Sequence, residues 1–118
     1  MNDKLIVLKE NQIISEKAYE ITNLAFEFLS EKFKSKYLAE SDMFWTHMSM
    51  ALTRIENGEP VEGPSELIVN EIKKSPFRNE IEEIISFVDL KFGIAIPQEE
   101  KDFFYLHLHR VLENNQSN

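Results

Sequence analysis

The spacing of apolar residues constrains the fold of this chain more than any other feature. In five stretches they recur every three or four positions, the period of one face of an α-helix. The three Gly and four Pro stand between these stretches and not inside them. Because each stretch has one apolar and one polar face, the pattern predicts an all-α fold, a compact bundle of about five amphipathic helices.

Start and stop residues set the expected helix limits. Ser15 suits an N-cap, as does Ser41 or Asp42, while Gly58 and Gly93 suit left-handed C-terminal stops. The predicted helices cover residues 15 to 33 or 36, 41–57, 64–75, 77–92 and 97–113.

A chain of 118 residues fits one domain with its own core. We expect an N-terminal arm or leader at residues 1–14, a helical domain at 15–114 and a frayed tail at 115–118. The apolar run from Leu5 to Leu8 leaves three alternatives open: a short strand, an arm that packs on the domain or on a second subunit, and a partly ordered leader.

Composition excludes several classes of function. Cysteine is absent, which rules out disulfides, thiolate nucleophiles and cysteine zinc sites. The net charge of −8 argues against nucleic acid and anionic membranes as partners and suits a partner with a positive docking face. Because the longest apolar run is too short for a membrane span or a signal peptide, we predict a soluble, cytoplasmic protein.

Two histidines interrupt apolar stripes and are the candidate functional residues. His47 lies about one helical turn after Phe44 in the second predicted helix, and His107 lies about one turn after Phe103 in the last. Arg54 lies two helical turns after His47 and should project in nearly the same direction. A single histidine on an apolar stripe is also compatible with a hydrogen-bonded core residue. His109 falls off the stripe, which predicts a surface residue.

Enzyme chemistry has little support in the sequence. The adjacent pairs Glu82-Glu83 and Glu99-Glu100 point about 100° apart on a helix, so we interpret them as solvated or helix-start residues. Neither a Gly-rich phosphate loop nor a serine nucleophile motif is present. A metal-dependent helical enzyme would need His47 and His107 joined by Asp102 or Glu100, which is a thin ligand set. We therefore predict a non-enzyme without a cofactor or metal.

Three segments together resemble the PTS regulation domain (PRD), the helical module of bacterial antiterminators and transcriptional activators controlled by the sugar phosphotransferase system. The first contains Thr46-His47, Ala51, Arg54 and Gly58, the second is Glu71 to Pro76, and the third runs from Phe92 through Glu100 to Leu108. The resemblance covers about residues 15–113. Three departures are Thr46, where the family usually has Asp, the loop from Pro60 to Ser65, and the expectation of a single copy after only about 14 residues, where full regulators carry an RNA- or DNA-binding segment before tandem copies.

The resemblance implies a stand-alone PRD protein that receives or senses phosphorylation on His47 or His107 and acts through protein–protein contacts in transcription regulation. Arg54, on the same face as His47, is the candidate partner for a phosphate or carboxylate. The resemblance implies HPr or a sugar-permease B component as phosphoryl donor, and a homodimer. An alternative is a helical scaffold that has lost the phosphoacceptor role, which the Thr46 departure would favour.

Overall fold

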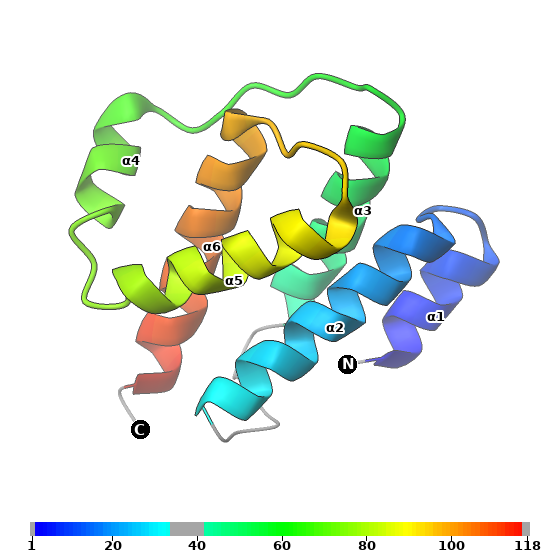
Figure 1. Ribbon diagram of the computed structural model, residues 1–118, viewed down its shortest axis with the longest axis horizontal. Helices are drawn as coiled ribbons and strands as arrows, with labels where there is room; N and C mark the ends of the chain where they lie inside the picture. Colours follow the sequence, from blue (N-terminus) through cyan, green and yellow to red (C-terminus); the bar gives the residue numbers. More distant parts are fainter. Residues whose placement is uncertain (1, 34–41, 117–118) are drawn as a thin grey trace.

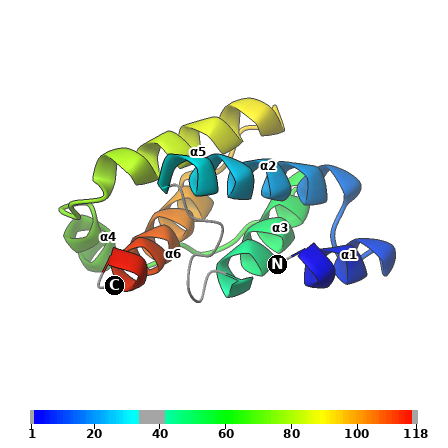
Figure 2. The same cartoon turned by 90° about the horizontal axis from the view of Figure 1, so that it is seen from below.

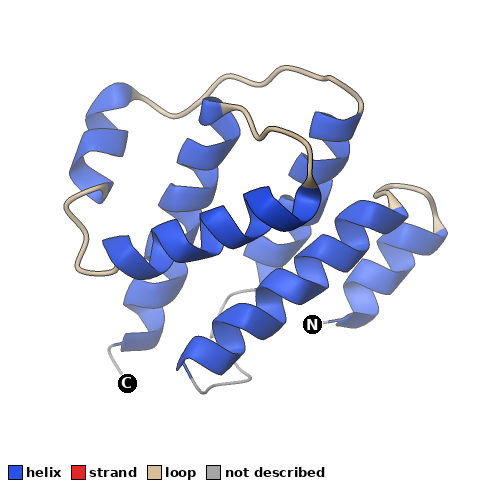
Figure 3. Cartoon of the chain, in the orientation of Figure 1, coloured by secondary structure: helices blue, strands red, loops and turns tan. Residues whose placement is uncertain are grey.

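The computed structural model describes residues 2–33 and 42–116, and in them it contains six α-helices and no strand (Figure 3). The predicted all-α bundle is confirmed, with one helix more than expected. The helices are α1 (Asn2–Glu10), α2 (Glu16–Phe33), α3 (Asp42–Glu56), α4 (Glu66–Ile72), α5 (Arg78–Phe92) and α6 (Gln98–Gln116). The expected cap at Ser41, a first helix extended to Lys36 and the last two residues of the tail lie outside the described residues.

The additional helix is α1, which forms where the sequence left three alternatives open. Leu5 is 1% exposed, and α1 contacts both α2 and α3. The strand interpretation of this segment is therefore wrong, because residues 2–10 form a helix that packs against α2 and α3. Ile14, in the turn that follows, is buried as well and joins α1 to the start of α2.

The long helices form two layers. Helices α2 and α5 lie side by side in one layer and cover α3 and α6 in the other (Figures 1 and 2). Helix α6 contacts α3, α4 and α5, while α1 and α4 flank opposite ends of the molecule (Figure 1). This arrangement places α3 and α6, which carry the two candidate histidines, in contact with each other.

Local chemistry explains most of the helix ends. The amide of Ala18 donates to Ser15 Oγ at 3.0 Å, so Ser15 is the predicted N-cap of α2. The amide of Ile68 donates to Ser65 Oγ at 3.3 Å, and α4 consequently begins after Ser65 and not at Pro64. Gly93 ends α5 with φ of 74°, a left-handed conformation that side chains with a Cβ adopt at a cost.

The core lies between the two layers and centres on an aromatic group. Trp45 is fully buried, with ring-centroid distances of 5.3 Å to Phe26 and 4.7 Å to Phe44, both edge to face. Fully buried aliphatic residues of α5 and α6, such as Ile84 and Leu108, belong to the same cluster. This packing fixes how α3 and α6 face each other. No described helix combines the length and apolar character that a membrane crossing needs.

Candidate functional site

The two candidate histidines meet where α3 and α6 pack together. The ring centroids of His47 and His107 are 5.9 Å apart, and the ring planes cross at 63°. His47 of α3 is exposed, so its position in the apolar stripe does not bury it, whereas His107 is half-buried. Because the His47 side chain is exposed, a visiting molecule can reach the pair from that side.

Aromatic neighbours hold the His107 ring. Phe103, one turn earlier in α6, stacks on it with centroids 6.2 Å apart and planes 15° from parallel. Phe44 of α3 approaches the same ring at 6.4 Å. These contacts place an imidazole between apolar surfaces and beside a second imidazole.

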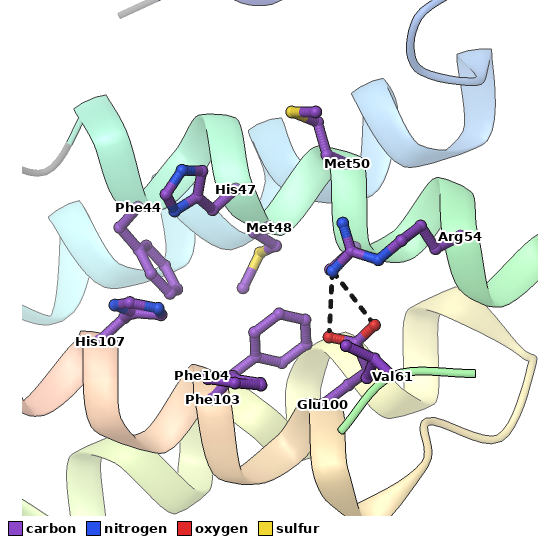
Figure 4. A pocket seen from close by; sticks show the side chains of 11 residues that line it. Phe44, His47, Met48, Met50, Arg54, Val61, Glu100, Phe103, Phe104 and His107 are labelled. Carbon is purple, nitrogen blue, oxygen red and sulfur yellow. Dashed lines mark hydrogen bonds and ion pairs between the residues drawn. The ribbon is translucent and has the colours of Figure 1, made fainter. Parts of the chain in front are cut away.

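The histidines lie at one end of a pocket of about 390 Å³ between α3 and α6 (Figure 4). Most of its wall is apolar, and its polar groups are the two imidazoles, Arg54 and Glu100. The lining residues are Phe44, His47, Met48, Met50, Ala51, Arg54, Val61, Glu100, Phe103, Phe104 and His107. All three sequence-predicted site residues therefore line one pocket.

Sequence reasoning missed the role of Glu100, which is 1% exposed and not solvated. Arg54 Nη2 donates to both of its carboxylate oxygens, at 3.4 Å to Oε1 and 3.3 Å to Oε2 (Figure 4). One signal was available: Glu100, Phe104, His107 and Val111 share the spacing of a single helical stripe. A carboxylate on a buried stripe is costly unless a cation pairs with it, and Arg54 is the cationic side chain that lines this pocket.

The environment shifts the protonation of two groups in the pocket. Burial lowers the pKa of His107 below its ordinary value of 6.5, and the nearby charges of His47 and Arg110 lower it further. His107 is therefore mainly neutral at pH 7. Burial raises the pKa of Glu100, and the adjacent Arg54 opposes this shift without cancelling it.

The predicted surface position of His109 is wrong. Its Nδ1 lies 2.8 Å from the hydroxyl of Ser75, its Nε2 lies 3.6 Å from Glu113, and its side chain is 18% exposed. The reason is that the turn between α4 and α5, which contains the buried Ser75, covers this side of α6. His109 thus joins that turn to α6, away from the pocket.

The metal-site alternative used Asp102 or Glu100 as a third ligand. Asp102 instead accepts a hydrogen bond from Gln98 at 2.9 Å, and Glu100 is paired with Arg54. Across residues 2–33 and 42–116, no group of three or more His, Asp or Glu side chains is placed to hold a metal ion.

Comparison with known proteins gave one finding. A family model described as PRD domain matches residues 40–111, a stretch that contains all of α3, α4 and α5, most of α6 and both pocket histidines. No curated protein and no solved structure matches the chain.

Proposed function

The chain belongs to the PRD domain family, and from that premise we propose that it is a regulatory module that accepts a phosphoryl group on His47 or His107. The observation that carries this proposal is the pair of imidazoles, 5.9 Å apart at one end of a pocket that also holds a guanidinium. Regulation is the general role of PRD domains in the phosphotransferase system. Our proposal adds that His47 or His107 accepts the phosphoryl group.

The chemistry requires a neutral imidazole that a donor can reach. An unprotonated ring nitrogen attacks the phosphorus of a phosphohistidine on the donor, so that a new N–P bond forms while the donor's N–P bond breaks. The lowered pKa of His107 keeps such a nitrogen available at neutral pH. His47 is the more exposed of the two rings and is the easier to reach.

Phosphorylation would change the charge balance of the pocket. The new group carries between about 1.5 and 2 negative charges and three strong acceptor oxygens. Its natural partner is Arg54, which currently contacts the buried carboxylate of Glu100. Competition for this guanidinium, together with repulsion between phosphate and Glu100, would favour a different packing of α3 on α6.

The proposed partners follow from the family and from charge. We expect HPr or a permease B component as phosphoryl donor, within the cytoplasm, and assembly of the chain as a homodimer. The net charge of −8 favours donors and targets with a basic docking face.

One sequence position favours a second candidate function, a scaffold without phosphorylation. Thr46 replaces the aspartate that usually precedes the first family histidine, and in this fold it is buried on α3. A scaffold would fold and capture its partner normally after both His47 and His107 are changed to alanine.

The test is transfer of radiolabel from phosphoenolpyruvate through the general phosphotransfer proteins to the full chain. We expect labelling of the unaltered protein and loss of label in His47→Ala, in His107→Ala or in both. His109→Gln is the matched control, because it changes the remaining histidine outside the pocket and should leave the label intact. Failure to label under conditions that label another PRD protein would overturn the proposal and favour the scaffold.

A further inference from the structure

The pocket between α3 and α6 is larger and more apolar than a phosphoryl group requires. At about 390 Å³ it falls within the range of sites for small organic molecules, about 300–1,000 Å³. Phosphate itself is small and strongly hydrated, so it gains nothing from contact with Phe44, Met48 or Phe104. The apolar wall therefore calls for a ligand with an apolar body.

The end of the pocket that holds Arg54 and Glu100 indicates the charge of that ligand. Arg54 is the permanent cation of the wall, and its side chain is 37% exposed. Both of its contacts with Glu100 use one nitrogen at 3.3 and 3.4 Å, whereas charge-assisted bonds are typically about 2.7–2.9 Å. Its Nε is buried without a hydrogen-bond partner in the described part of the chain. The guanidinium is thus incompletely used by Glu100.

We propose that this pocket binds a small amphiphilic anion, which places a phosphate or carboxylate group on Arg54 and an aromatic or aliphatic body against Phe44, Met48 and Phe104. The acidic group approaches Arg54 from its exposed side and competes with Glu100 for the guanidinium. The body lies beside the His107 ring, which is mainly uncharged at pH 7 and accepts an apolar neighbour.

Such a ligand would shield both imidazoles from a protein donor, because His47 and His107 line the same pocket. Binding would make access to the histidines depend on a metabolite as well as on the donor. The proposal goes beyond phosphorylation and does not require it, so its binding test contains no phosphoryl donor.

Methionine methyl groups report on the site directly. Met48 and Met50 line the pocket, whereas Met43 lies on the same helix, is 60% exposed and does not line it. We would titrate the full chain, labelled with ¹³C at its methionine methyls, with phenyl phosphate, inorganic phosphate and benzyl alcohol. Phenyl phosphate should shift the Met48 and Met50 methyl signals in a saturable way and leave the Met43 signal unchanged. The other two probes should bind at least about tenfold more weakly.

The variant Arg54→Gln/Glu100→Gln removes both charges and so leaves no buried carboxylate without its cation. It should keep the folded spectrum, retain its response to benzyl alcohol and lose its preference for phenyl phosphate. A preference that survives in this variant would overturn the role of Arg54.

Three further outcomes would overturn the proposal. One is no saturable shift of Met48 and Met50 up to about 10 mM phenyl phosphate. A second is equal binding of either control probe. The third is a shift of the same signals with protein concentration alone and no effect of phenyl phosphate, which would mean that a second copy covers the pocket.

Discussion

At the scale of single residues, the protonation of His107 links the pocket to pH. Burial and the charges of His47 and Arg110 lower its pKa below 6.5 in the folded protein. Between the folded pKa and about pH 6.5, His107 therefore binds a proton more readily in the unfolded chain than in the folded one. Stability from this group is present above about pH 6.5 and is lost as pH falls through the folded pKa.

We predict that His107→Gln, which cannot take up the proton, loses less stability than the unaltered protein between pH 6.5 and the folded pKa. Each unit of pKa difference corresponds to about 1.4 kcal/mol of unfolding free energy. Urea denaturation at a series of pH values measures the effect, and NMR titration of the ring gives the pKa. Identical pH profiles for the two proteins would contradict the account.

The Arg54–Glu100 pair gives a second prediction. Arg54→Gln leaves a carboxylate that is 1% exposed without its cation and should cost about 2 kcal/mol, a value reduced from that of a fully buried pair because Arg54 is partly solvated. Glu100→Gln should cost less, because the guanidinium can turn to water. In a double-mutant cycle by urea denaturation, the double variant should be more stable than Arg54→Gln alone. Additive losses would show that the two groups do not interact.

The Glu100 carboxyl also sets the sign of a pH effect in Arg54→Gln. Burial raises the pKa of Glu100, and loss of Arg54 removes what opposes this shift. The stability that comes from the protonated form is present below the unfolded pKa and is lost as pH rises through the folded pKa. The variant should therefore recover stability as the pH is lowered from 7 towards the ordinary glutamate value of 4.5.

At the scale of elements, the helix stop at Gly93 can be tested by itself. A Cβ added at this position would meet no atom within 4 Å, so the cost of a substitution comes from the backbone alone, at φ of 74°. We predict that Gly93→Ala lowers the unfolding free energy by about 1 kcal/mol and that Gly93→Asn lowers it less, because asparagine tolerates this conformation better. Thermal or urea denaturation measures both. Equal stability of all three proteins would contradict the assigned stop.

Helix α1 gives a matched pair of substitutions. Leu5 is 1% exposed and Val7, which points to nearly the opposite side of the same helix, is 56% exposed. Leu5→Ala should lower the unfolding free energy by about 2–3 kcal/mol, while Val7→Ala should change it by less than about 0.5 kcal/mol. If both substitutions are neutral in urea denaturation, α1 does not contribute to the domain.

Sequence patterns predicted the five helices α2 to α6, because their apolar residues keep a helical period between clear caps such as Ser15 and Gly93. They did not decide the structure of α1. Its apolar residues, Leu5 to Leu8, are consecutive, and a short continuous run has no period that separates helix from strand. Contact with α2 and α3 decides its structure, and that contact is not readable from a local pattern.

At the scale of the whole molecule, the site exists because two distant helices are packed together. Sequence alone singled out His47, His107 and Arg54, and the fold brings all three to one pocket. The spacing of α6 could have placed Glu100 on its buried stripe, but neither its partner nor that of His109 could be read from the sequence, because both partners come from other elements. Arg54 of α3 faces Glu100, and Ser75, before α5, reaches His109 on α6.

The most direct test of the central claim is mass spectrometry of the full chain purified from cells under non-acidic conditions that preserve phosphohistidine. Cells would be compared with and without a sugar taken up by the phosphotransferase system. We predict a phosphoryl group on His47 or His107, with an occupancy that changes with the sugar, and none on His109. Absence of phosphate from both pocket histidines in every condition, while another PRD protein in the same cells carries it, would contradict the account.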